Sequence, residues 1–326
     1  MVSSAARKAV LVLTNTEDGT ADPVIHHLSE RGVPVVRMDP GDFPASMTVE
    51  AAFDGEHWEG AVHDAFRGVD LGSVRSVYYR RPSQFTLAEG MSGPDQRWAY
   101  REARMGFGGV LLALDCLWIN QPSRMSAAEY KPVQLATAAR AGLRVPRTII
   151  TNVPGHAADW AAGISGPVVY KPIGGALHVE QGRTWIVYAN AVAAVEELRD
   201  PAVGLTAHCF QEWVDKAFEV RLTIVGKAMS AVAIHARSQA AHIDWRSDYG
   251  AHRYEVVDVP DAVRFGLERY MHAFGLVYGA ADFVVSPDGR WTLLEVNPNG
   301  EWGWLADHCG LPVGQSIAAL LEKGQM

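Results

Sequence analysis

The segment from Val277 to Pro298 most constrains the fold, because it is an apolar hairpin that carries polar side chains on one face. Two apolar runs flank turn-forming residues at Pro287–Gly289. Side chains alternate along a strand, so Glu295 and Asn297 point the same way. Burying a carboxylate without a partner is unfavourable. The sequence therefore predicts a positively charged group in front of this pair.

Asp282 lies in the strand before the turn and can converge with Glu295 and Asn297 at one end of the hairpin. Two carboxylates and an amide oxygen are hard ligands that suit Mg²⁺, which usually shares its shell with phosphate. Zinc instead favours clustered His and Cys. The alternative is a hairpin with a surface Asp and a turn-forming Asn-Pro.

Lys171 ends the β-branched run of "PVVYKPIGG" and is followed closely by Gly174 and Gly175. A lysine in this position can reach phosphates while N–H groups of the glycine loop cover them. The sequence of a Walker A loop is absent. The alternative is an ordinary solvated lysine beside a turn.

The stretch "CFQEWVDKAFEVR" joins an apolar strand to a further strand and can offer backbone groups to a flat base. Glu219 and Arg221 lie on one face of that further strand. Glu219 can accept from ribose hydroxyls, and Arg221 can hold a phosphate or a carboxylate. The alternative is a cross-strand ion pair.

Composition narrows the class of protein. The 326 residues are 48% hydrophobic, as expected for two or three globular domains. A net charge of −8 argues against broad nucleic-acid binding. The three cysteines form no CxxC pair, which predicts reduced thiols. No run is long enough to span a bilayer, and "AVLVL" is too short for a signal peptide, so we expect a cytoplasmic enzyme without membrane or nucleic-acid partners.

The expected elements begin with a β-α-β unit and end in antiparallel pairs. Asp22 is expected to cap the first helix and Gly32 to end it. Ser126 and Glu129 match a capping box, but Pro132 requires that helix to kink or to begin near Tyr130. Further predictions are strands at 9–15, 34–39, 73–82, 147–152, 167–173 and 184–190, a hairpin at 48–63, helices at 95–114, 192–200 and 261–275, and strands at 208–214 and 219–238.

Taken in order, these residues resemble the ATP-grasp carboxylate ligases over about residues 120–318. Thirteen residues separate Asp282 from Glu295, which begins an ExN motif, and seven separate Glu212 from Glu219. Both steps are similar to the metal motif and the adenine hinge of that family. The ordered set is Lys131, Lys171, Gln211, Glu212, Trp213, Val214, Glu219, Arg221, Asp282, Glu295 and Asn297.

The resemblance implies roles and a fold. Lys131 and Lys171, with the loop at Gly174–Gly175, would hold ATP phosphates. The hinge at Glu212, Trp213 and Val214 would meet adenine, and Glu219 the ribose. Asp282, Glu295 and Asn297 would bind Mg²⁺, and Arg221 would face the γ-phosphate. The implied fold class is α/β (α+β), an ATP-grasp fold with a pre-ATP-grasp domain at 1–120, a central subdomain at 121–210 and a C-terminal antiparallel-sheet subdomain with the metal site at 211–326.

Three strings resemble a narrower family, the ATP-grasp maturases of ribosomally made peptides, which are microviridin-type or graspetide macrocyclases. They are "VYYRRPSQF", "IDWRSDYG" and "EVNPNGEWGWL". This resemblance implies ATP-dependent activation of Asp or Glu side chains in a precursor peptide, with leader and core, as acyl phosphates. Thr, Ser or Lys side chains would then form macrocyclic ω-ester or ω-amide bonds. It also implies possible homo-oligomers.

Arginines are the candidates for holding the substrate carboxylate, because a guanidinium pairs with it through two hydrogen bonds. Arg237 and Arg246 are the candidates, with surface solvation as the alternative. Arg80 and Arg81 can contact substrate or brace a domain interface, and bracing is favoured. The tryptophans of "EWGWL" can close over the nucleotide or fill the core, and the core is favoured.

Two other functions stay open. An intermolecular ATP-grasp ligase would add an amino acid to a protein or small acid, which gives a mass gain instead of loss of water. A catalytically inactive peptide-binding module is the third possibility, although retention of both lysines and all three metal ligands argues against it.

Overall fold

The computed structural model describes residues 8–175, 177–180, 183–186, 189–236 and 252–326. It is a mixed α/β structure of several sheets, as expected. In this part of the chain no helix has both the length and the apolarity that a bilayer crossing requires. Cys116, Cys209 and Cys309 are all free thiols, in agreement with the prediction.

The N-terminal region contains a four-stranded parallel sheet in the order β2-β1-β6-β7. All five residues of β1 are buried, as expected for the centre of a parallel sheet. The predicted β-α-β opening is confirmed. The elements are β1 (Ala9–Leu13), α1 (Asp22–Glu30), β2 (Val35–Met38), β6 (Val74–Tyr79), α2 (Gly93–Leu112) and β7 (Leu117–Ile119).

The prediction that Asp22 caps α1 is wrong, because the cap is Ala21 and Asp22 is the first helical residue. The Asp22 carboxylate instead pairs with Arg37 at 2.7 Å. Gly32 follows the helix end at φ 67°, so the predicted stop is confirmed. The predicted hairpin is also confirmed and belongs to a three-stranded sheet of β3 (Thr48–Phe53), β4 (Trp58–His63) and β5 (Gly68–Asp70).

In place of the one helix expected from the capping box at Ser126 and Glu129, there are two helices, α3 (Pro122–Glu129) and α4 (Lys131–Arg140). The predicted capping box is wrong, since Ser126 and Glu129 both lie inside α3. Pro132 occupies the first turn of α4, where its missing N–H leaves no hydrogen bond unmade. This break after Tyr130 places Lys131 at the start of α4.

A four-stranded sheet in the order β12-β9-β13-β8 forms the central lobe, next to the short hairpin β10–β11. The α-helix expected at 192–200 is wrong. Two 3₁₀ turns occupy Val195–Arg199 and Pro201–Leu205, because Pro201 holds Asp200 in an extended conformation. The other elements are β8 (Thr148–Thr151), α5 (Pro154–Ala162), β9 (Val168–Lys171), β10 (Leu177–Glu180), β11 (Arg183–Ile186), β12 (Asn190–Ala191) and β13 (His208–Glu212).

The C-terminal region is built on a five-stranded antiparallel sheet in the order β16-β15-β14-β17-β18. Leu267 and Tyr270 of α7 pack against Leu222 and Phe283 in the main core. The face of the sheet away from this core is left for the site. The elements are β14 (Phe218–Val225), β15 (Ala228–Ala236), β16 (His252–Val257), α7 (Asp261–Phe274), β17 (Tyr278–Val285) and β18 (Trp291–Asn297).

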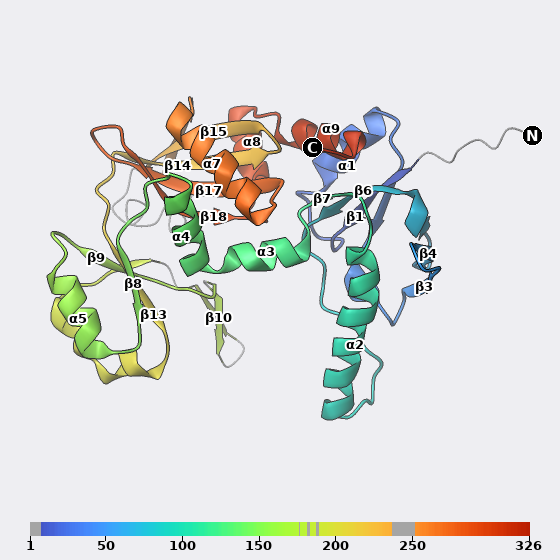
Figure 1. The fold of residues 1–326 in the computed structure, drawn as a ribbon, viewed down its shortest axis with the longest axis horizontal. Coiled ribbons are helices and arrows are strands. Elements are labelled where there is room, and N and C mark those ends of the chain that lie inside the picture. Colours follow the sequence, from blue (N-terminus) through green and yellow to red (C-terminus); the bar gives the residue numbers. More distant parts are fainter. Residues whose placement is uncertain (1–7, 176, 181–182, 187–188, 237–251) are drawn as a thin grey trace, which may run out of the picture.

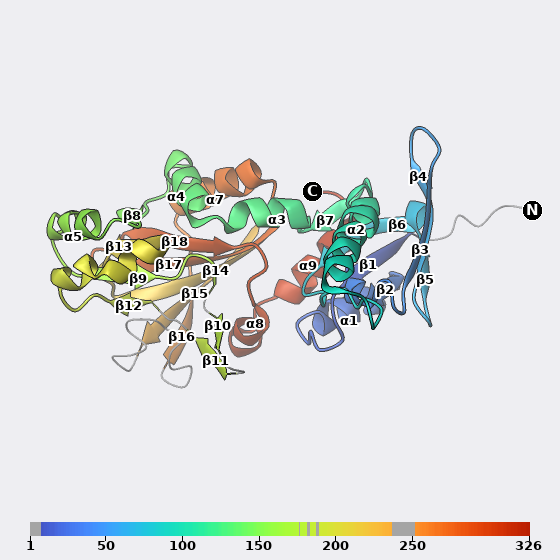
Figure 2. The ribbon, with the colours of Figure 1, turned by 90° about the horizontal axis from the view of Figure 1, so that it is seen from below.

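The end of the chain returns to its beginning (Figures 1 and 2). Helices α8 (Gly303–Cys309) and α9 (Val313–Lys323) follow β18, and Ile317 and Leu321 pack with Val10 of β1. Trp302 is buried in the same cluster, so the core interpretation of this tryptophan is confirmed. The three predicted domain limits stay a prediction.

Candidate functional site

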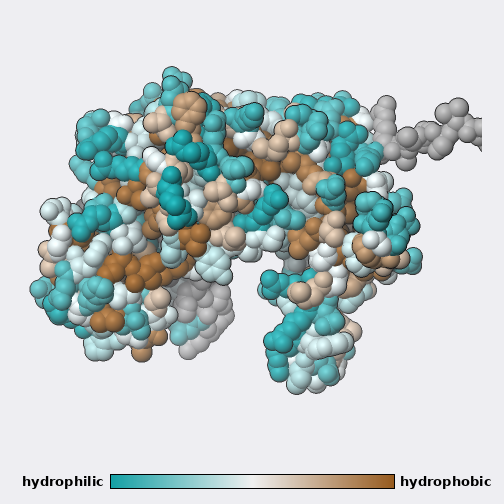
Figure 3. Space-filling view, viewed as in Figure 1, coloured by the Kyte–Doolittle hydropathy of each residue, from teal (hydrophilic) through white to brown (hydrophobic). Residues whose placement is uncertain are grey.

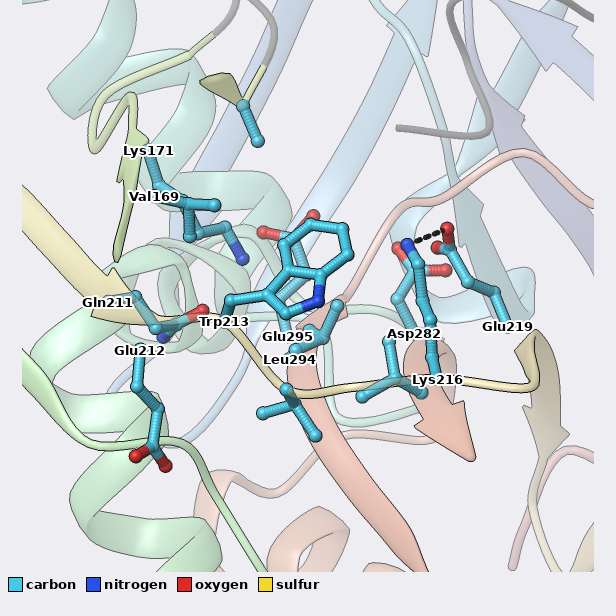
Figure 4. A pocket seen from close by; sticks show the side chains of 13 residues that line it. Val169, Lys171, Gln211, Glu212, Trp213, Lys216, Glu219, Asp282, Leu294 and Glu295 are labelled. Atoms are coloured by element: carbon cyan, nitrogen blue, oxygen red, sulfur yellow. Dashed lines mark hydrogen bonds and ion pairs between the residues drawn. The ribbon is translucent and has the colours of Figure 1, made fainter. Parts of the chain in front are cut away.

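A pocket lies between the central lobe and the five-stranded sheet (Figure 4). Its wall on one side comes from β9 and from β13 with the segment that follows it. The opposite wall comes from β14, β17 and β18. The polar and aromatic residues that line it are Lys171, Gln211, Glu212, Trp213, Lys216, Glu219, Asp282 and Glu295, and Val214 lines it as well.

A second pocket adjoins the first and shares Lys171 and Glu295 with it. Helices α3 and α4, the glycine loop after β9 and the end of β18 line this second pocket. Lys171 and Glu295 therefore lie at the junction of two spaces. The lining residues include Arg104, Lys131, Gln134, Gly174, Gly175 and Asn297.

Three neighbouring strands place Arg221, Asp282 and Glu295 in one row. Arg221 is opposite Asp282 across β14 and β17, and Asp282 is opposite Glu295 across β17 and β18. The register between β17 and β18 shifts beside Asp282, since Phe283 is opposite Leu293. This bulge leaves one extra residue in β18 and sets the direction of Glu295.

Two cations face the carboxylates, as predicted from the position of Glu295 in an apolar strand. Arg221 donates to both oxygens of Asp282 at 2.8 Å, and Lys131 forms an ion pair with Glu295. Burial acts to lower the pKa of the Arg221 guanidinium, but the Asp282 carboxylate more than offsets this, so the pKa is raised. The Arg221 guanidinium is thus held in its charged form, and its hydrogen bonds to both oxygens fix the geometry of the pair.

Lys171 is a less well compensated cation. Burial lowers the pKa of its ammonium group, Glu295 opposes that change, and Lys131 adds to it. An ammonium group in this state gains stability when an anion arrives. The position at the junction of the two pockets therefore suits a phosphate.

Asp282, Glu295 and Asn297 have the donor chemistry for Mg²⁺. Their two carboxylates are cross-strand neighbours, and Asn297 follows Glu295 by two residues on an exposed strand end. Within the described ranges no group of three or more His, Cys, Asp or Glu could hold a metal. One or two carboxylates suffice for Mg²⁺ when substrate phosphates complete the shell. The donor set fits an ion that binds together with a nucleotide.

Glu212 directs its side chain away from the pocket (Figure 4). Its carboxylate accepts from the Arg147 backbone N–H at 2.9 Å, and its own N–H donates to the Arg147 carbonyl. These bonds fix the end of β13 where the chain enters the pocket wall. Glu212 can therefore meet a base through its main chain and not through its carboxylate.

Lys216 is a pocket residue that sequence reasoning missed. Its ammonium donates to Glu219 Oε1 at 2.5 Å and lies 5.0 Å from the centre of the Trp213 ring. Both members of the ion pair are only 8% exposed. A lysine three residues before Glu219 was the available signal. Lys216 holds the Glu219 side chain in one orientation.

Arg80 braces the interface between the N-terminal region and the loop after β18. It is 2% exposed and donates to Glu301 at 2.8 Å and to Asn299 at 3.1 Å. It also pairs with Asp18 at 3.4 Å. Arg81 pairs with the same Glu301 from a more exposed position. The bracing interpretation is confirmed, and the brace fixes the loop that follows Asn297.

The predicted glycine loop lies at the second pocket. Gly174 and Gly175 are exposed at the second pocket, and Gly175 has a φ of 130°, which favours glycine. Arg237 and Arg246 lie outside the described residues.

Comparison with known proteins agrees with this geometry. Residues 9–126 match a family model described as the MvdD pre-ATP grasp domain. A "Probable alpha-L-glutamate ligase" of Klebsiella pneumoniae (strain 342) is 26% identical over 212 residues, which are 63% of this chain and 67% of the relative.

Two solved structures are similar over nearly the whole chain. The Chryseobacterium gregarium RiPP-associated ATP-grasp ligase, in complex with ADP and a leader and core peptide, has a TM-score of 0.87 and 26% identity and covers 96% of each chain. The macrocyclase MdnC of Microcystis aeruginosa MRC, bound with precursor peptide MdnA, has a TM-score of 0.82 and 27% identity and covers 97% of this chain and 99% of its own. With the row of site residues, these similarities identify the chain as a member of the ATP-grasp carboxylate ligase superfamily that resembles the macrocyclases of ribosomally made peptides.

Proposed function

We propose that this chain is an ATP-dependent peptide macrocyclase. It activates Asp or Glu side-chain carboxylates of a ribosomally made precursor as acyl phosphates and joins them to Thr, Ser or Lys side chains as ω-esters or ω-amides. The observation that carries the proposal is the meeting of two pockets at Lys171 and Glu295. The first pocket suits a nucleotide, and the adjoining second pocket suits the substrate carboxylate that accepts the phosphoryl group.

The nucleotide occupies the first pocket. The main chain of Glu212 and Val214 meets the adenine edge, and Trp213 lies beside it. Glu219, held by Lys216, accepts from the ribose hydroxyls. This arrangement directs the phosphates toward Lys171 at the junction.

The phosphates meet a cluster of cations. Lys131 and Lys171 hold them, and Arg221 faces the γ-phosphate beside Asp282. Asp282, Glu295 and Asn297 would hold Mg²⁺, which when bound neutralises phosphate charge and aligns the reacting oxygens. Ion pairs with Lys131 and Arg221 hold the Glu295 and Asp282 carboxylates in position at the site.

The reaction follows from this alignment. A substrate carboxylate oxygen in the second pocket attacks the γ-phosphorus, the bond to the β-phosphate oxygen breaks, and ADP leaves. A hydroxyl or amine of the same peptide then attacks the acyl carbon, loses its proton and releases phosphate. Each bond removes one water from the peptide. Alignment of the reacting groups and stabilisation of the charge in the transition state accelerate the reaction, and no protein nucleophile is needed. Arg237 and Arg246 are proposed to hold the substrate carboxylate.

Mass spectrometry tests the proposal. The enzyme is incubated with ATP, Mg²⁺ and the precursor peptide encoded beside its gene. We expect the peptide to lose the mass of one water for each bond, while ADP and phosphate accumulate. An unchanged peptide mass in the presence of bound ATP contradicts the proposal.

The similarity to a probable alpha-L-glutamate ligase favours a second candidate, an intermolecular ligase. That enzyme would join a free amino acid to a carboxylate through the same acyl phosphate. A mass gain that requires added glutamate selects it over the macrocyclase.

A further inference from the structure

Helix α2 is an arm with little packing of its own. Of its 20 residues only Ala103, Phe107, Val110 and Leu111 are buried, and all lie in its second half. Figure 1 shows the helix projecting from the N-terminal sheet. Trp98 is 66% exposed and Met105 is 73% exposed. Large exposed apolar side chains on a projecting helix indicate a surface that binds a partner.

Charges on α2 are segregated by side. Arg97, Arg101 and Arg104 follow the spacing i, i+4, i+7, so they lie in one stripe. Asp95 and Glu102 fall on another side of the helix. In the part of the chain that the structure describes, no carboxylate forms an ion pair with any of these three arginines.

The stripe is continuous with the candidate site, because Arg104 lines the second pocket. From Arg104 the stripe runs along the helix toward Arg97, away from the pocket. Trp98 and Met105 neighbour it on the helix surface. Figure 3 shows the arm as a mainly hydrophilic projection, separated by a hollow from the lobe that contains β9 and β13. The arm, helix α2, thus borders the entrance to the second pocket.

We propose that this arginine face, formed by Arg97, Arg101 and Arg104 with Trp98 and Met105, docks an acidic segment of the peptide substrate and leads it into the second pocket. The inference rests on the proposed function. A peptide rich in Asp or Glu is repelled by a chain of net charge −8 unless a local positive surface receives it. The apolar pair covers side chains between the acidic residues.

The test is a binding assay with a defined probe. A fluorescein-labelled peptide of alternating Thr and Glu is titrated with the full chain, and its Thr and Gln counterpart serves as the uncharged probe. In R97E/R101E we expect affinity for the Glu peptide to fall about tenfold, with a weaker salt dependence. Affinity for the Gln peptide and for fluorescent ATP stays at the wild-type value.

R140E/R144E is the matched control, since it carries the same charge change on exposed arginines of α4 and the loop after it. It should bind the Glu peptide like wild type. Equal affinity of R97E/R101E and wild type for the Glu peptide overturns the inference. A change in oligomeric mass without a change in peptide affinity also overturns it, because a second copy then covers the face. Failure of the wild type to bind ATP instead contradicts the proposed function.

Discussion

Replacing Glu295 by Ala separates catalysis from folding. The Glu295 side chain is 22% exposed and its partner Lys131 is 23% exposed, so solvent screens their ion pair. Losing a pair of this kind costs about 1 kcal/mol or less of folding free energy. For a chain of this size that is a fall in Tm of about 2–4 °C at most. The variant should therefore remain folded.

The effect on activity is expected to be much larger. Glu295 joins the two pockets and, in our proposal, is one of two carboxylates that hold Mg²⁺ on the phosphates. Losing one electrostatic contact to a transition state costs about 3–4 kcal/mol, or about 10²–10³ in kcat. Lys131 also loses its partner, which leaves its position less fixed.

The assay compares ADP release, product mass and Tm in wild type, Glu295→Ala and Asp288→Ala. Asp288 is the matched control, because it is an exposed carboxylate in the turn of the same hairpin. Its variant should retain wild-type turnover. Unchanged ADP release in a folded Glu295→Ala protein would refute the metal assignment.

Three further predictions follow from the charges. Burial lowers the Lys171 pKa from its usual value of 10.5, so kcat/KM for ATP should fall as the pH rises, and the fall should be centred below pH 10.5, where the lysine loses its charge. In Lys171→Arg this fall should move to higher pH, and a fall at the same pH would contradict a role for the Lys171 charge in binding phosphate. Lys216→Met should raise KM for ATP about tenfold and leave KM for 2′-deoxy-ATP nearly unchanged, because it releases Glu219; equal changes for both nucleotides would argue for a general loss of structure. Arg80→Leu should lower the free energy of unfolding, measured by chemical denaturation, by about 3–5 kcal/mol, since the Asp18 carboxylate is left buried without its cationic partner. A loss under 1 kcal/mol would mean that the brace does not stabilise the fold.

Local pattern was enough to predict most strands. The hairpin from Val277 to Pro298 and the pairing of β14 with β15 follow from alternation and turn residues. Alternation also placed Glu219 with Arg221 on one face. It could not reveal the bulge beside Asp282, because one extra residue in β18 leaves no mark in an apolar run. The direction of Glu295 therefore needed the structure.

Contacts between segments far apart in the sequence could not be predicted from the residue pattern within either segment. The brace from Arg80 to Glu301 joins residues 221 positions apart, and nothing in either string specifies the other. The sequence allows two alternatives at the break between α3 and α4, because Pro132 is compatible with a kinked helix as well as with the start of a new one. The Lys216–Glu219 pair was missed because a charged residue near a turn is usually solvated.

The fate of a carboxylate oxygen would decide whether this site makes an acyl phosphate. Precursor peptide labelled with oxygen-18 in its Asp and Glu carboxylates is incubated with the enzyme, ATP and Mg²⁺, and the released phosphate is analysed by mass spectrometry. We expect one labelled oxygen in phosphate for each bond formed, and none in the Glu295→Ala variant. Product formation with unlabelled phosphate would contradict activation of the carboxylate at the junction of the two pockets.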